Sequence, residues 1–207
     1  ISRNRKVSNR ANIIKAINPG TLYVDLSKIE YNNVDSILSY IISSKVLIFD
    51  LRKNCKFIIH DLCAKLFPNH FDFYSVTTPN YHKPGVYCYR QGDGSGPEEF
   101  NPNYYKGRII ILVNHATQSI GEFTAMALSM HEKSTIIGNN TSGADGNVSQ
   151  IYLPGNIETH ISGIGIYWLD GRETQRVGIT PDIMVFPKIS SIENQYDDIL
   201  EEAIKYA

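Results

Sequence analysis

Apolar residues fall into short runs that alternate with amphipathic segments along the chain. The runs at residues 46–49 and 109–113 are apolar without interruption, a pattern typical of strands buried on both faces of a parallel sheet. Further short strands are expected at 21–24, 134–138 and 183–186. Apolar positions recur at helical spacing over 34–42, 58–67, 119–130 and 196–207. This alternation of strands and helices predicts an α/β domain.

The two ends of this pattern differ in character. Residues 1–19 are polar and end in the turn sequence Asn18-Pro19-Gly20, so we expect a linker or a remnant of a preceding domain there. Residues 20–207 are expected to form the folded domain. Glycine, proline, asparagine and tyrosine are frequent over 79–107, where 91–97 is expected to be a loop. The start has neither Met nor the apolar core of a signal peptide, which indicates a mature or excised piece.

Composition narrows the function classes. The 207 residues are 42% hydrophobic and 20% charged, which excludes a disordered chain. A net charge of −1 argues against a dedicated nucleic-acid binder, because such proteins normally carry a basic excess. No apolar run reaches the length of a membrane-spanning helix. The cysteines lack the spacing of a metal site, and no metal or organic cofactor is implied.

Polar loops follow three of the predicted strands, at residues 50–54, 114–122 and 138–146. In open α/β sheets such loops gather beyond the carboxyl ends of the strands, where ligands bind. Ser119 lies where a strand passes into a helix, so free backbone N–H groups would face an oxyanion formed beside its hydroxyl. Ser119 and Glu122 also match a capping box that only begins a helix. The local pattern leaves both roles open.

Five segments, taken in order, carry a family resemblance. They are the apolar strand with Asp-Leu-Arg-Lys-Asn at 46–54, Thr-Gln-Ser-Ile-Gly-Glu at 117–122, the Thr-Ser-Gly-Ala-Asp-Gly loop within 136–146, Leu-Pro-Gly at 153–155 and the closing Asp-Gly-Arg to Pro-Asp segment at 170–182. This set resembles the S41 serine peptidases, which include the C-terminal processing proteases and their tricorn-like relatives. The resemblance covers residues 20 to 205. It implies a crotonase-like or ClpP-like α/β core of mixed sheet with packed helices, and a serine endopeptidase that favours C-terminal or unfolded segments.

The resemblance also assigns the groups that stabilise the reacting oxygen. Ser119 matches the nucleophile position, and the backbone N–H of Ile120 matches a donor of the oxyanion hole. The family takes a second donor from a Gly-Gly pair, where this chain has Cys55-Lys56-Phe57. Lys56 is therefore the candidate for the second donor.

The general base is where the chain departs from the family. Processing proteases use a lysine where this chain has Ala144. Tricorn-like relatives use a histidine from a segment ahead of their PDZ domain, with a glutamate where this chain has Gln175. Within the chain, His115 is the histidine nearest in sequence to Ser119 and is the candidate base. Gln150 and Gln175 are candidates for orienting a catalytic group.

We therefore expect the catalytic core of a serine endopeptidase that acts through an acyl-enzyme on Ser119 and takes its base from an absent N-terminal part. The chain alone is then expected to show little or no activity. Its expected partners are a peptide or unfolded protein substrate and a preceding PDZ or helical domain. The resemblance implies an extracytoplasmic location, periplasmic or secreted. The alternatives are an inactive peptide-binding module of the same fold, indicated by Ala144, Gln175 and the missing Gly-Gly pair, and a crotonase-fold enzyme acting on acyl thioesters.

Overall fold

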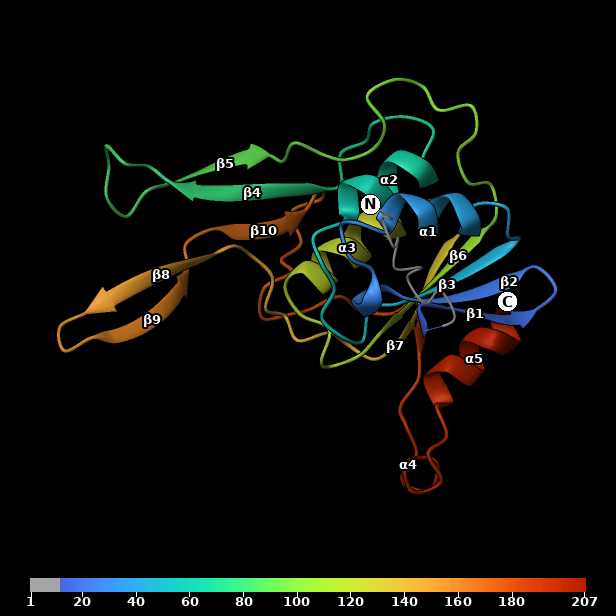
Figure 1. The fold of residues 1–207 in the computed structure, drawn as a ribbon. Helices are drawn as coiled ribbons and strands as arrows, with labels where there is room; N and C mark the ends of the chain where they lie inside the picture. The colour runs from blue at the N-terminus through green and yellow to red at the C-terminus, as the bar shows by residue number, and fades with distance from the viewer. Residues whose placement is uncertain (1–11) are drawn as a thin grey trace, which may run out of the picture.

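The core of the computed structural model, which describes residues 12–207, is a six-stranded sheet in the order β1-β2-β3-β6-β7-β11 (Figure 1). Five of its strands run parallel: β2 (Thr21–Asp25), β3 (Val46–Asp50), β6 (Arg108–Val113), β7 (Ser134–Gly138) and β11 (Ile183–Met184). Strand β1 (Ile14–Asn18) is antiparallel to β2. The sheet is therefore mixed, and the α/β prediction is confirmed. The crotonase-like or ClpP-like character stays a prediction.

Helices cover both faces of this sheet. Leu47 and Phe49 of β3 pack into a core shared with α1 (Val34–Ile41), α2 (Ile59–Leu66) and α3 (Ile120–Ser129). Val46 and Ile48, which alternate with these residues along β3, point to the opposite face and pack against α5 (Asp198–Tyr206). Because β3 is buried on both faces, it needs the uninterrupted apolar run that its sequence shows.

Residues 14–18, expected to belong to a linker, instead form β1 at the edge of the sheet. Ile13 and Ile14 are buried in the core beside α1, which explains why this segment joins the domain. The turn at Pro19-Gly20 links β1 to β2 as a hairpin, and Gly20 has a φ of +98° that favours glycine. The domain therefore begins before residue 20. Residues 1–11 of the expected linker lie outside the described residues.

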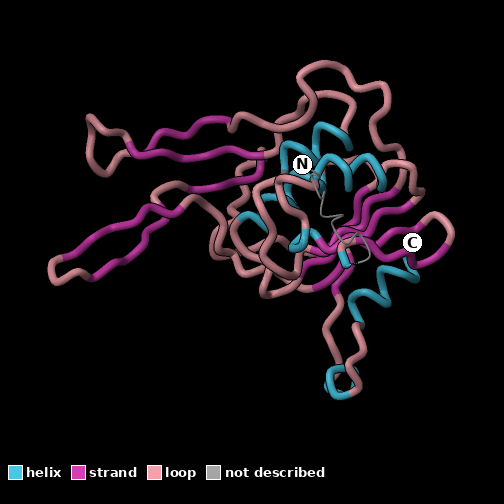
Figure 2. Tube along the Cα trace, viewed as in Figure 1, coloured by secondary structure: helices cyan, strands magenta, loops and turns pink. Residues whose placement is uncertain are grey.

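Two β extensions project from the helix-covered sheet (Figures 1 and 2). One is a three-stranded sheet of β4 (Tyr74–Pro79), β5 (Tyr87–Gln91) and β10 (Gly165–Trp168). The other is a hairpin of β8 (Val148–Leu153) and β9 (Ile157–Ser162). Strand β5 was not expected in the glycine- and proline-rich segment. Every residue of β5 is exposed. A strand without a buried face needs no alternation of apolar and polar residues, so its sequence lacks the pattern by which strands are recognised.

Two further helical elements in the described part of the chain are short, η2 (Leu26–Lys28) and α4 (Ile189–Glu193). Within residues 12–207, no helix has both the length and the apolar character that crossing a bilayer requires.

Candidate active site

The three polar loops that follow β3, β6 and β7 meet at one edge of the sheet. The Thr117 hydroxyl donates to the Leu51 carbonyl oxygen at 3.0 Å, which joins the second loop to the first. The Ser142 N–H donates to the Thr117 carbonyl oxygen at 3.0 Å, which joins the third loop to the second. The predicted gathering of these loops is confirmed.

Ser119 occupies the N-cap of α3 in an unusual backbone conformation. Its φ is +49° and its ψ is −118°, in a region that residues with a side chain seldom adopt. Such strain of about 1–3 kcal/mol persists only where the surroundings impose it, and it clusters at functional sites. Ile120 begins the helix, and its N–H has no acceptor among residues 12–207. That N–H is available to an oxyanion formed at Ser119.

Glu122, in the first turn of α3, is fully buried and holds the second and third loops together. Its carboxylate accepts hydrogen bonds from the backbone N–H groups of Ser119 at 3.2 Å, Gly143 at 2.8 Å and Ala144 at 2.9 Å. The Thr141 hydroxyl donates to the same carboxylate. The capping residue expected from the sequence therefore also fixes the loop after β7.

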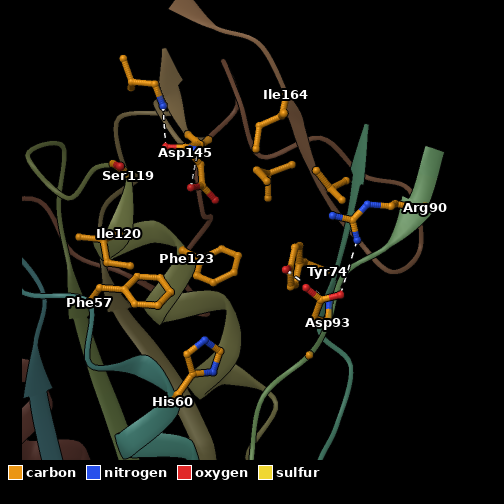
Figure 3. Close-up of a pocket in the computed structure, with 16 residues that line it drawn as sticks. Phe57, His60, Tyr74, Arg90, Asp93, Ser119, Ile120, Phe123, Asp145 and Ile164 are labelled. Carbon is orange, nitrogen blue, oxygen red and sulfur yellow. Dashed lines mark hydrogen bonds and ion pairs between the residues drawn. The ribbon is translucent and has the colours of Figure 1, made fainter. Parts of the chain in front are cut away.

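A largely apolar cavity of about 640 Å³ opens beside Ser119 (Figure 3). Its apolar walls come from the segment before α2, from β4 and α3, and from β10 with the residue before it, through Phe57, Tyr74, Val76, Phe123, Ile164 and Ile166. A second cavity of about 610 Å³ is lined by more polar residues, including Gln118, Gln175 and Arg176. Ser119 lines both cavities, so it lies where the two meet.

Asp145 also lines both cavities and is only 5% exposed. Its Oδ1 accepts a hydrogen bond from the Gly146 N–H at 2.7 Å, whereas its buried Oδ2 has no partner among the described residues. Burial raises the pKa of Asp145, the Gly146 hydrogen bond partly offsets this effect, and the charge of Glu122 adds to it, which leaves a pKa of about 7. The sequence placed Asp145 in a motif but gave no sign of this environment.

The Gln175 side chain fixes the backbone of that loop. Its Nε2 donates to the Asp145 carbonyl oxygen at 2.8 Å and to the Ile164 carbonyl oxygen at 2.9 Å. Gln175 therefore ties the loop after β7 to the segment before β10. The structure brings Ser119, Ile120 and Gln175 of the predicted site into one region.

Three other predicted site residues lie elsewhere. His115 is exposed and lines neither cavity that contains Ser119. Gln150 is exposed on β8, opposite His160 on β9, and also lines neither. The Lys56 ammonium group lies 3.8 Å from the Glu30 carboxylate, outside both cavities.

His60 is the one histidine among residues 12–207 that lines either cavity. Its Nδ1 lies 3.1 Å from the hydroxyl oxygen of the buried Ser95, and its ring packs edge-on against Phe57. Figure 3 shows His60 at the far end of the apolar cavity from Ser119, beyond Phe57 and Ile120.

The sequence profile of peptidase family S41 matches residues 59–185, more than half of the chain. The chain belongs to peptidase family S41. The carboxy-terminal-processing protease of Bartonella bacilliformis is similar to this S41 chain, with 34% identity over 95 residues. That match covers 46% of the chain and 22% of the relative. The family expected from the sequence motifs is confirmed.

Solved structures resemble the S41 chain in fold. A candidate peptidase from Parabacteroides merdae superimposes with a TM-score of 0.77 and 20% identity, covering 93% of this chain and 63% of that one. The photosystem II D1 C-terminal processing protease gives a TM-score of 0.59 and 17% identity, and the match covers 92% of this chain and 48% of that one. The S41 chain thus spans less than two thirds of each of these relatives.

Proposed function

We propose that this S41 domain is the core of a serine endopeptidase that cleaves peptide bonds through an acyl-enzyme on Ser119. One observation carries the proposal: Ser119 is held in a strained conformation at the start of α3, at the meeting point of two cavities. Membership of a peptidase family supports the assignment of peptide hydrolysis to this residue.

The position of Ser119 suits acyl transfer. When its hydroxyl oxygen attacks a peptide carbonyl, the negative charge that develops on the carbonyl oxygen needs preorganised donors. The free N–H of Ile120 and the positive end of α3 supply that stabilisation.

The two cavities support a peptide substrate. A peptide bond placed at Ser119 has chain on both sides, and Ser119 lines two cavities that can take the flanking residues. Burial in these cavities requires an extended segment, which favours unfolded or C-terminal stretches of a protein. A preceding PDZ or helical domain and an extracytoplasmic location remain proposals that rest on the family resemblance.

A second candidate function is a peptide-binding module without turnover. It is favoured by one observation: among residues 12–207, no lysine lines either cavity, and Ala144 lies in the loop where processing proteases carry their lysine. This candidate makes the same use of the cavities but assigns no chemistry to Ser119.

Hydrolysis of a fluorogenically labelled unfolded protein tests the proposal. We expect Ser119→Ala to lower turnover by roughly 10³-fold or more, because the nucleophile is removed. Ser39→Ala, on the exposed side of α1, is the matched control and is expected to turn over substrate as the wild type does. Equal turnover by Ser119→Ala contradicts the proposal. Peptide binding without turnover in every variant supports the binding module instead.

A further inference from the structure

A serine hydroxyl needs a neighbour that accepts its proton before it can attack a peptide carbonyl. Ala144 has no group that accepts a proton, and His115 lies outside both cavities. His60 is hydrogen-bonded to Ser95 at the end of the apolar cavity far from Ser119. Among the ionisable side chains of residues 12–207 that line these cavities, only Asp145 lines both of the cavities that Ser119 lines.

The Asp145 carboxyl is held within the site with one of its oxygens unpaired. The hydrogen bond from Gly146 holds Oδ1, and the Gln175 amide holds the Asp145 carbonyl group. Oδ2 is buried without a partner among the described residues. Burying a carboxylate oxygen without a hydrogen-bond partner costs free energy of folding, so an unpaired oxygen in a folded protein calls for an explanation. Figure 3 shows the carboxyl turned into the apolar cavity, on the side where Ser119 lies.

We infer that Oδ2 of Asp145 accepts the proton of the Ser119 hydroxyl, so that the catalytic base belongs to this chain. The inference rests on the proposed function of Ser119. It replaces the expectation that the base comes from a preceding segment.

With Asp145 as the base, each proton transfer in acylation and deacylation has a donor and an acceptor. As the Ser119 oxygen forms its bond to the peptide carbonyl carbon, the O–H bond breaks and the proton passes to Oδ2, while the carbonyl π electrons move to the oxygen facing Ile120. When the tetrahedral intermediate collapses, the C–N bond breaks and Asp145 returns the proton to the leaving amine. Water then attacks the acyl ester and gives a proton to Asp145, which passes it to the Ser119 oxygen as the ester bond breaks.

The base strength of Asp145 suits this task. A pKa of about 7 means that the carboxyl is roughly half ionised at neutral pH, yet binds a proton far more strongly than an exposed aspartate does. Ser119 and Asp145 are not hydrogen-bonded to each other in this structure. The transfer therefore requires a local rearrangement that brings the Ser119 hydroxyl to Oδ2 of Asp145, since catalytic hydrogen bonds often form fully only with substrate bound.

The rate at which a fluorophosphonate probe labels Ser119 between pH 5 and 9 tests the inference. In the wild type, we expect the rate to rise about tenfold per pH unit below pH 7 and to level off above it, as Asp145 loses its proton. Asp145→Asn keeps the shape but cannot accept a proton, so labelling should fall by about 10²-fold or more and lose this rise. Asp35→Asn, exposed on α1, is the matched control and should follow the wild-type profile.

A rescue experiment separates a base from a merely structural residue. Asp145→Gly leaves space in the loop, and added formate should restore part of the labelling rate in this variant but not in Ser119→Ala. A carboxyl titration of Asp145 by ¹³C NMR gives a readout independent of activity, with an expected midpoint near pH 7 that is absent in Asp145→Asn.

The outcomes distinguish this inference from the function on which it rests. If Asp145→Asn is labelled at the wild-type rate with the same pH profile, or if Asp145 titrates near pH 4, the inference is overturned and the proposed function of Ser119 stands. If Ser119 is not labelled at any pH in the folded full-length protein either, the proposed function itself is overturned.

Discussion

The buried carboxylate of Glu122 accepts a hydrogen bond from the backbone N–H of Ser119 at 3.2 Å. Because the same carboxylate also accepts from Gly143 and Ala144, one charge positions both the proposed nucleophile and the loop that carries Asp145. The negative charge of Glu122 also contributes to the raised pKa of Asp145. Glu122 thus holds the Ser119 backbone, fixes the loop after β7 and raises the pKa of Asp145.

Glu122→Gln is expected to destabilise the protein by about 1–3 kcal/mol. Both carboxylate oxygens accept backbone N–H groups, Oε1 from Gly143 and Oε2 from Ala144, so either orientation of a glutamine amide places a donor against a donor. The free energy of unfolding in urea measures the loss. Glu132→Gln, at a side chain that is 65% exposed, is the control and should be nearly neutral. An unchanged unfolding midpoint for Glu122→Gln would show that the network contributes nothing to stability.

Ser119→Gly and Ser119→Ala both remove the hydroxyl but differ in backbone freedom. Glycine adopts a φ of +49° without strain, whereas alanine does not. We expect Ser119→Gly to be more stable than Ser119→Ala by about 1 kcal/mol, although neither retains a nucleophile. Thermal unfolding of the two variants provides the comparison. A melting temperature for Ser119→Ala equal to or above that of Ser119→Gly contradicts the strained conformation.

Asp145→Asn is expected to stabilise the protein at pH 8 by about 1–4 kcal/mol. The folded pKa of about 7 lies above the value of about 3.9 in an unfolded chain, so ionisation of Asp145 opposes folding. This penalty is complete above pH 7 and disappears as the pH falls from 7 to about 4. The advantage of Asp145→Asn over the wild type should therefore shrink over that interval. Melting curves from pH 4 to 8 test this, and a constant difference argues against a raised pKa.

Arg52 links the end of β3 to the start of α5. Its guanidinium donates to the carboxylates of Asp50 and Asp197, with N–O distances of 2.7 Å in both pairs. Arg52→Met should lower the free energy of unfolding by about 2–3 kcal/mol, because it leaves the buried Asp50 without its cation. Arg172→Met, at a pair whose side chains are largely exposed, should cost about 1 kcal/mol or less.

The same ion pairs should make the effect of Arg52→Met depend on pH. Burial alone would raise the pKa of Asp197, but hydrogen bonds from Arg52 and from the Leu200 N–H outweigh it and lower that pKa. The stabilisation is therefore present above the ordinary aspartate pKa and is lost as the pH falls below about 4. Urea unfolding at pH 7 and at pH 3 measures this, and a difference between wild type and Arg52→Met that is as large at pH 3 as at pH 7 contradicts it.

Sequence patterns predicted the parts of the site that depend on local order. The apolar runs at 46–49 and 109–113 located β3 and β6, and strand parallelism then placed the loops after them at one edge. The pattern around Ser119 located the start of α3 to within one residue. These successes rest on periodicity and on the geometry of parallel sheets.

Sequence patterns could not predict the features that depend on distant packing. The burial of Asp145 arises where Gln175 bridges its loop to Ile164, and neither contact leaves a trace in the residues around 145. His115 is near Ser119 along the chain, yet its side chain is exposed outside the cavities, since closeness in sequence does not fix direction in a turn. The polar composition before residue 20 concealed β1, although Ile14 at its start and Ile13 just before it are buried in the core.

A covalent acyl-enzyme at Ser119 is the central intermediate of the proposed mechanism, and rapid acid quenching of a reaction with an activated peptide ester tests it most directly. Mass spectrometry of the digested protein should find the acyl group on the peptide that contains Ser119, and should find none in Ser119→Ala. Ester hydrolysis with the acyl group on another residue, or at an equal rate in Ser119→Ala, would contradict the proposed role of Ser119.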